Sequence, residues 1–159
     1  MGTYSQVLFH IVFSTRLRVP ALVKEQRPRL FEYIWGIIKN RRGHLYRING
    51  VEDHLHALTS IPPSMALADF VRDVKWISSR WIKNERVFPD FDAWQVGYAA
   101  FTHSVREKDV LIEYIKRQEE HHRTVLFLDE LERLLRDAHI EFDESQLSSS
   151  PTPQGRPRE

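Results

Sequence analysis

Two histidines separated by one residue, His54 and His56, lie in a stretch with the composition of a β-strand. Residues i and i+2 of a strand point to the same side, so the two imidazoles project together while Leu55 points to the other face. Two neutral imidazoles side by side can bind a divalent metal ion. The same spacing is common among ordinary residues at a sheet surface, so the pair alone leaves both interpretations open.

A second pair of chemically useful side chains follows later in the chain. Tyr114 and Gln118 are four residues apart in a segment with helical periodicity, so they share one helix face. The amide oxygen of Gln118 could join the two histidines as a third ligand, leaving positions on Mg²⁺ or Mn²⁺ for phosphate oxygen and water. Such an ion polarises a phosphate and favours attack by a phenol, whose free pKa is about 10. The four residues together predict a metal-dependent nuclease that forms a phosphotyrosine.

The segments that must position these residues alternate between strand and helix patterns. Strands are expected at 4–14, 44–51, 54–61 and 97–105, and helices at 24–41 and 66–85. The order β-α-β-β-α-β predicts an α+β fold of the ferredoxin-like kind, with a four-stranded antiparallel sheet and two helices on one face. Further helices are expected at 106–122, after an N-cap at Ser104, and at 124–138. These added C-terminal helices carry the tyrosine.

Composition limits the remaining possibilities. The 159-residue chain is predicted to form one domain over residues 1–144, followed by a flexible tail at 145–159 with little to bury. The absence of cysteine excludes disulfides and thiolate metal sites and suits a cytoplasmic protein. We see no secretion signal and no run of the roughly 20 apolar residues that a membrane span needs, so no membrane partner is expected.

The net charge of +1 does not by itself indicate a nucleic-acid-binding protein, but the basic residues are unevenly placed. Some follow the first strand and others share one face of the helix at 66–85, where they could equally be solvated surface residues. The candidate phosphate contacts are Arg16, Arg18, Arg72, Lys75, Arg80 and Lys83. Candidate platforms for base stacking are Trp76, Tyr98 and the aromatic loop at 88–94, although core packing is the simpler interpretation of each.

Four other residues near these motifs need an interpretation. His10 is predicted to be a buried, hydrogen-bonded residue of the first strand rather than a ligand. Asp53 could orient a ligand or belong only to a turn. His121 and His122 follow the tyrosine helix and are interpreted as structural or peripheral, since Gln118 already supplies the third ligand.

The stretch 51–56 resembles the His-hydrophobic-His motif of HUH nucleases, and residues 114–122 resemble the Tyr-x-x-x-Gln helix of single-tyrosine HUH transposases. Residues 7–16 and 94–101 also look like this family, so the likeness spans about residues 3–143. These are small transposases of bacterial and archaeal insertion sequences. The resemblance therefore implies a cytoplasmic, nucleoid-associated protein.

The resemblance also implies an activity. Family members are homodimers that cut and rejoin single-stranded DNA at hairpin-marked element ends, forming a 5′-phosphotyrosine and releasing a 3′-OH. The tyrosine helix of one subunit can complete the metal site of the other. By this likeness His54, His56 and Gln118 are ligands of Mg²⁺ or Mn²⁺, and Tyr114 is the nucleophile.

Two other functions fit the same residues. One is a domesticated, non-mobile module that binds hairpin DNA without cutting it. The presence of all four site residues argues against it, because a retired site is free to lose them. The other is a nickase like those that initiate replication or conjugation, although 159 residues leave no room for the helicase that larger members carry.

Overall fold

A four-stranded antiparallel sheet forms the centre of the computed structural model, which describes residues 1–148. Its strands lie in the order β2-β3-β1-β4, with β1 antiparallel to both β3 and β4. This order matches the α+β, ferredoxin-like arrangement predicted from the sequence. The strands are β1 (Leu8–Ser14), β2 (His44–Gly50), β3 (His54–Ser60) and β4 (Ala99–His103).

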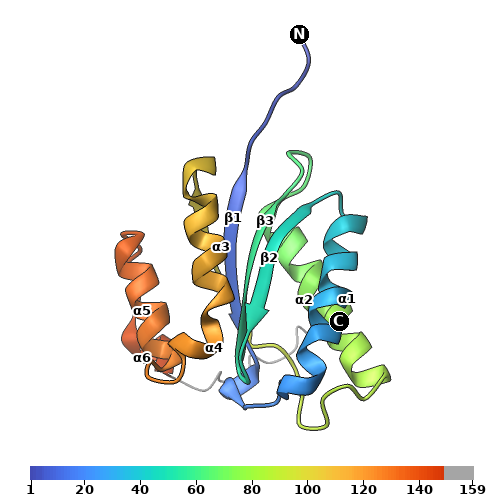
Figure 1. The fold of residues 1–159 in the computed structure, drawn as a ribbon, viewed down its shortest axis with the longest axis vertical. Coiled ribbons are helices and arrows are strands. Elements are labelled where there is room, and N and C mark those ends of the chain that lie inside the picture. Colours follow the sequence, from blue (N-terminus) through green and yellow to red (C-terminus); the bar gives the residue numbers. More distant parts are fainter. Residues whose placement is uncertain (149–159) are drawn as a thin grey trace, which may run out of the picture.

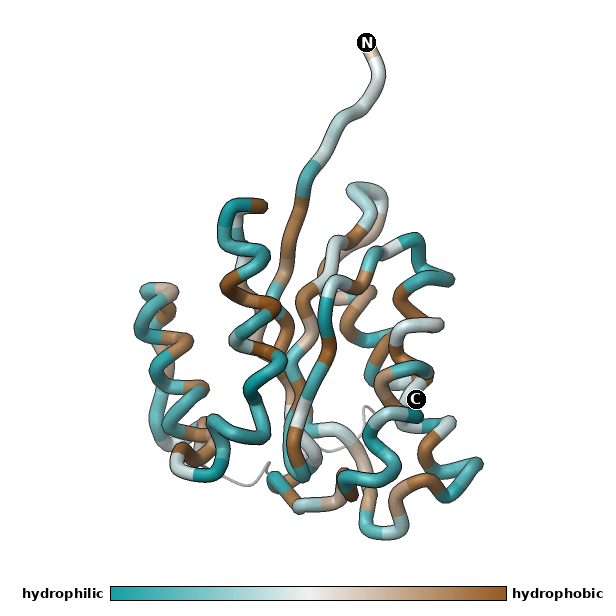
Figure 2. Tube along the Cα trace, in the orientation of Figure 1, coloured by the Kyte–Doolittle hydropathy of each residue, from teal (hydrophilic) through white to brown (hydrophobic). Residues whose placement is uncertain are grey.

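Two long helices cover one face of the sheet, as Figure 1 shows. They are α1 (Arg27–Asn40) and α2 (Leu67–Asn84), with short 3-10 turns η1 (Arg16–Arg18) and η2 (Lys24–Gln26) before α1. Apolar side chains between this helix pair and the sheet form the main core, including Leu30, Phe70, Ile11 and Leu55. Figure 2 shows hydrophobic and hydrophilic segments alternating along the helices, as expected for elements that bury one side.

The opposite face of the sheet is covered by the C-terminal helices (Figure 1). These are α3 (Lys108–Lys116), α4 (Gln118–His121) and α5 (Phe127–Asp137), and the 3-10 turn η3 (Val105–Glu107) precedes α3. Ser104 and Glu107 form a capping box at this turn, in agreement with the expected N-cap. The added helices therefore leave neither face of the sheet open.

The helix expected at 106–122 is interrupted at Arg117, between α3 and α4. The side-chain amide of Asn49 on β2 donates hydrogen bonds to the backbone oxygens of Ile115 and Lys116, at 3.0 and 3.1 Å. An uninterrupted helix would use these oxygens to accept bonds from the next turn. The neighbouring strand thus fixes where α3 ends and turns the chain so that Gln118 points inward.

A small apolar cluster attaches α5 to the sheet. Val12 and Phe101 of the sheet contact Phe127 and Leu135 of the helix, and Leu147 packs at the edge. Leu147 belongs to α6 (Glu144–Ser148), and its backbone oxygen accepts a hydrogen bond from Arg18 at 3.2 Å. Residues 145–148 are therefore helical, which corrects their assignment to a flexible tail, because this leucine has an apolar surface to bury against. The rest of that tail, 149–159, lies outside the described residues.

No helix within residues 1–148 combines the length and apolar character that crossing a membrane requires.

Candidate functional site

The two histidines of the His-x-His pair lie at the centre of the sheet. β3 runs between β2 and β1, and His54 and His56 are both fully buried. Their side chains project toward α3–α5, whereas Leu55 packs in the main core beneath α1 and α2. Strand alternation thus places the pair together on one face, as the spacing predicted.

Each histidine is held by a partner at its Nδ1 atom. Nδ1 of His54 donates to the Asp53 carboxylate at 2.7 Å, so Asp53 orients this ring. Nδ1 of His56 lies 2.8 Å from Nε2 of His10, whose ring stacks against it. Burial, together with the neighbouring His56, lowers the pKa of His10 well below its usual value. His10 is therefore a buried, hydrogen-bonded histidine, as expected, and both Nε2 atoms of the pair are left facing inward.

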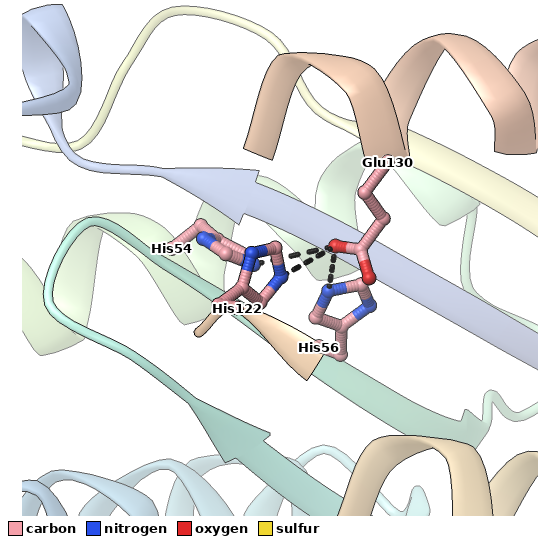
Figure 3. A group of neighbouring side chains, drawn as sticks. All are labelled: His54, His56, His122 and Glu130. Atoms are coloured by element: carbon pink, nitrogen blue, oxygen red, sulfur yellow. Dashed lines mark hydrogen bonds and ion pairs between the residues drawn. The ribbon is translucent and has the colours of Figure 1, made fainter. Parts of the chain in front are cut away.

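These nitrogens converge on a carboxylate that the sequence analysis did not single out. Glu130 of α5 is fully buried, and its Oε1 atom lies 2.9 Å from Nε2 of His56 and 3.4 Å from Nε2 of His54. Nε2 of His122 is 3.1 Å from the same oxygen. Figure 3 shows the three imidazoles arranged around this one carboxylate.

The histidines after the tyrosine helix both lie at this carboxylate, although the sequence suggested a structural or peripheral role. Nδ1 of His122 donates to the backbone oxygen of Val125 at 2.7 Å. In the neutral tautomer its Nε2 is then an unprotonated nitrogen facing the oxygens of Glu130 and Gln118. Nε2 of His121 lies 3.1 Å from the second oxygen of Glu130. The Nε2 lone pair of His122 and the lone pairs of these oxygens repel one another, so a cation bound between them would stabilise the arrangement.

The electrostatics of this cluster are strongly coupled. Burial alone would raise the pKa of Glu130, but the neighbouring imidazoles of His122, His54 and His56 outweigh burial and hold the pKa far below its usual range. Burial lowers the pKa of His56 to about 4 despite the same carboxylate. For His54 burial is outweighed by Asp53 and Glu130, which raise its pKa. The cluster thus holds an ionised carboxylate beside the His56 imidazole, which burial keeps neutral.

The donor atoms fit a divalent metal ion. One ligand atom from each of His54, His56, His122 and Glu130 lies within 4.8 Å of the others. Nε2 of His54 is buried without a hydrogen-bond partner within the described part of the chain, which is an unusual state for a polar atom. Imidazoles whose other nitrogen donates to a carboxylate or a backbone oxygen, as in His54 and His122, are typical of metal ligands. Imidazole nitrogens suit divalent transition metals, and the carboxylate oxygen also suits Mn²⁺.

Tyr114 and Gln118 reach the same carboxylate from α3 and α4. The Tyr114 hydroxyl donates to Oε2 of Glu130 and accepts a hydrogen bond from Arg133 at 3.1 Å. The Gln118 amide nitrogen donates to Oε2 at 3.2 Å, and its oxygen lies 3.0 Å from Nε2 of His122. Burial, and then the Glu130 carboxylate, raise the pKa of Tyr114. All four site residues predicted from the sequence therefore meet around Glu130 within one chain.

Tyr114 can be approached from outside the protein. A groove of about 780 Å³ opens beside it and is also lined by Arg117, His121 and Thr124. The side chain of His121 is partly exposed here, whereas the carboxylate behind it is fully buried. A large substrate can therefore reach the phenol while the histidine pair stays enclosed.

The six candidate phosphate contacts have different surroundings. Arg16 pairs with Asp92 at 3.1 Å, and Arg72 pairs with both Asp69 and Asp73. Lys75 donates to two backbone oxygens at 2.6 Å each, those of Gln95 and Gly97, and burial lowers its pKa to about 8. These three side chains are already engaged within the protein.

Arg80 and Lys83 lie on the exposed side of α2, whereas Arg18 bonds to the backbone of α6. The Arg80 guanidinium lies 4.8 Å from the ring centre of Trp76, which is 58% exposed. Tyr98 is also exposed. In contrast, the aromatic residues of the loop at 88–94 are buried in the main core, so core packing is the correct interpretation of that loop.

Comparisons with known proteins identify a related sequence and solved structures with a similar fold. The chain is 24% identical over 127 residues to the ISDra2 transposase TnpA of Deinococcus radiodurans, covering 74% of this chain and 87% of that protein. A solved structure of a candidate transposase from Deinococcus radiodurans R1 has a TM-score of 0.58 at 23% identity, with 74% of this chain and 96% of that chain covered.

A second solved structure, a REP-associated tyrosine transposase bound to a REP hairpin, also has a TM-score of 0.58, at 15% identity. It covers 79% of this chain and 76% of that one. The family described as transposase IS200 like matches residues 3–118, well over half of the sequence. The chain therefore belongs to the IS200-like transposase family.

Proposed function

We propose that this transposase cuts and rejoins single-stranded DNA at hairpin-marked element ends, through a covalent bond between Tyr114 and the 5′-phosphate. The observation that carries the proposal is that the Tyr114 phenol and the Nε2 atoms of His54 and His56 meet at the single buried carboxylate of Glu130. A hairpin as ligand is supported by the related fold, since one structure of that fold is of a transposase bound to a REP hairpin.

We further propose that a divalent metal ion is held by His54 and His56 with oxygen from Gln118 or Glu130. When bound, such an ion polarises the phosphate and stabilises the negative charge that develops as phosphorus is attacked. Of the two ions expected from the sequence, Mg²⁺ and Mn²⁺, the imidazole donors fit Mn²⁺ better, because Mg²⁺ prefers oxygen ligands.

The covalent step assigns roles to the surrounding residues. The Tyr114 oxygen attacks phosphorus, the bond from phosphorus to the 3′-oxygen breaks, and that oxygen leaves as a 3′-OH after taking up a proton. Oε2 of Glu130 orients the phenol by accepting its hydrogen bond, and Arg133 stabilises negative charge on the phenol oxygen. The proton that the phenol loses balances the one that the 3′-oxygen takes up. Rejoining is the reverse reaction, in which a 3′-OH attacks the phosphotyrosine. No ATP is needed because the phosphodiester is retained as an ester.

The DNA is proposed to contact the basic residues named above. Arg80 and the exposed Trp76 lie side by side. Proteins that bind single-stranded DNA typically combine a cation, which contacts phosphate, with an aromatic ring, on which a base stacks. Arg16, Arg18, Arg72, Lys75 and Lys83 would contribute phosphate contacts. For this, Arg16, Arg72 and Lys75 would exchange the partners that they have within the protein.

The protein is proposed to act as a homodimer in the cytoplasm, associated with the nucleoid. Light scattering after size-exclusion chromatography tests this directly, with twice the chain mass expected. A monomeric mass at working concentration contradicts it.

The proposed reaction is tested with a single-stranded oligonucleotide that carries one element end and its hairpin, incubated with Mn²⁺. We expect a covalent protein–DNA adduct that resists denaturation, and Tyr114→Phe should abolish it while leaving hairpin binding intact. An adduct formed by Tyr114→Phe would overturn the assignment of the nucleophile. Binding without an adduct would instead support a non-catalytic module, and cutting without rejoining would support an initiator-like nickase.

A further inference from the structure

The centre of the site comes from a part of the chain outside the family match. The match ends at Gln118, yet Glu130 and His122 both lie beyond it. The carboxylate is supplied by α5, which the small cluster of Val12, Phe101 and Phe127 holds against the sheet. The role of Glu130 therefore has to be argued from this chain's own geometry.

The two oxygens of Glu130 face different groups. Oε1 lies 2.9, 3.1 and 3.4 Å from the Nε2 atoms of His56, His122 and His54. Oε2 accepts hydrogen bonds from the Tyr114 hydroxyl and from the Gln118 amide. One side chain thus lies between the candidate metal ligands and the candidate nucleophile.

Two roles for this carboxylate are physically possible. It could occupy the place of the ion in the empty protein and be expelled when metal binds. It could instead stay and act as a ligand. Neighbouring ligands around an ion with bonds of about 2.1 Å stand about 3.0 Å apart in octahedral geometry and about 3.4 Å apart in tetrahedral geometry. The three separations from Oε1 are close to these values, so Oε1 can become a ligand after only a small movement of the side chain.

Charge supports the same choice. Within the cluster, Glu130 is the only fully buried carboxylate among the described residues, and its Oε1 atom faces three imidazoles, with no lysine or arginine side chain among the contacts of this oxygen in that part of the chain. A buried carboxylate is stabilised by a positive charge, and a divalent ion supplies that charge better than neutral imidazoles do. Expelling Glu130 would also break its hydrogen bond from Tyr114.

We propose that Glu130 binds the metal ion through Oε1 and holds the Tyr114 phenol through Oε2, so that a single residue of α5 positions both. This inference rests on the proposed function. It adds that metal occupancy and the position of the nucleophile are coupled, and that α5 belongs to the active site of this chain.

The test measures Mn²⁺ affinity and the state of Tyr114 separately. Mn²⁺ is titrated calorimetrically into the full-length wild type, Glu130→Ala and Glu130→Gln. The matched control is Glu132→Ala, because Glu132 lies on the same helix but pairs only loosely with Arg136, at 4.0 Å. The tyrosines are replaced by 3-fluorotyrosine, and the fluorine signal of Tyr114 is assigned from its loss in Tyr114→Phe.

We expect Glu130→Ala to weaken Mn²⁺ binding at least tenfold and to remove the shift that Mn²⁺ causes in the Tyr114 signal. Glu130→Gln keeps the shape but not the charge, so a smaller loss of affinity is expected, and this variant carries the test if the alanine variant does not fold. Glu132→Ala should behave as wild type.

Unchanged or tighter Mn²⁺ binding in Glu130→Ala and Glu130→Gln would overturn the proposal and show that the carboxylate competes with the ion. If Mn²⁺ does not change the fluorine signal of Tyr114 in the wild type, the proposed coupling between metal binding and the position of Tyr114 is wrong. These outcomes are independent of the proposed reaction, which fails only if the wild-type protein forms no Tyr114–DNA adduct.

Discussion

The two faces of the sheet are built on opposite principles, although the same strands supply both. On β3, Leu55 packs beneath α1 and α2 among apolar side chains, while His54 and His56 lie beneath α3–α5 among charged and polar ones. The first face is stabilised by burial of apolar surface, which depends on volume and shape. The second is stabilised by hydrogen bonds and ion pairs, each of which needs a particular partner.

Stability therefore depends mainly on the α1–α2 face of the sheet, and the candidate chemistry depends on the α3–α5 face. Apolar packing tolerates similar side chains, whereas the polar face around Glu130 depends on the identity of each residue. A substitution on the α1–α2 face should therefore change the free energy of unfolding and leave metal binding of the folded protein unchanged. A substitution on the α3–α5 face should change metal binding and DNA cleavage.

The largest effect is expected on the apolar face. Leu55→Ala leaves a cavity at a fully buried position, so the free energy of unfolding should fall by about 2–5 kcal/mol. Urea denaturation measures this change. Mn²⁺ affinity, measured at a concentration of urea where the variant is folded, should stay within about twofold of wild type. A tenfold loss of affinity would show that the two faces are not separable.

On the polar face, His56→Ala removes one candidate ligand. Mn²⁺-dependent adduct formation should fall by about 100-fold or more, because the remaining donors no longer enclose the ion. Gel-shift titration should show hairpin binding within a few-fold of wild type. His44→Ala, on the exposed end of β2, is the matched control and should retain full activity. Full cleavage by His56→Ala would refute the metal assignment.

Acid should destabilise the metal-free protein through the same face. The pKa values of His10 and His56 are lowered by burial, so the unfolded chain takes up protons below pH 6.5 while these two rings stay neutral in the folded chain. The raised pKa of His54 acts in the opposite sense, since its contribution is full below pH 6.5 and is lost as the pH rises.

The pKa of His121 is also lowered, but this side chain is partly exposed and contributes less. With the lowered values of the two fully buried rings against one raised value, we expect the free energy of unfolding to fall by about 1–2 kcal/mol between pH 7 and 5. Urea denaturation at several pH values, with chelator present, measures this. His10→Gln should flatten the profile by removing one of the two groups. A stability that rises toward pH 5 would contradict the description of the cluster.

The smallest effect is expected far from both buried regions. Arg80→Ala should weaken binding of single-stranded DNA about three- to tenfold and reduce the slope of log affinity against log salt by about 1, with stability unchanged. Fluorescence anisotropy at several salt concentrations measures both quantities. Arg106, exposed in η3, provides the control. Equal salt-dependence slopes for Arg80→Ala and wild type would show that Arg80 does not contact the DNA.

Local patterns in the sequence were sufficient for the sheet and for the histidine pair. Alternation along β3 determines which side chains share a face, and the order of strands and helices predicts the topology. The position of Glu130 depends instead on how α5 packs across the sheet, and no spacing within α5 indicates that. The break at Arg117 likewise depends on Asn49, which is distant in sequence. Local sequence patterns do not predict contacts between elements that are distant in the sequence.

The most direct test of the account is an anomalous difference map from crystals of the protein soaked in Mn²⁺. We predict one strong peak bounded by Nε2 of His54, Nε2 of His56 and Oε1 of Glu130, with the Tyr114 hydroxyl still bonded to Oε2. A peak elsewhere, or none at saturating Mn²⁺, would contradict the claim that the polar face of this sheet is a metal-dependent active site.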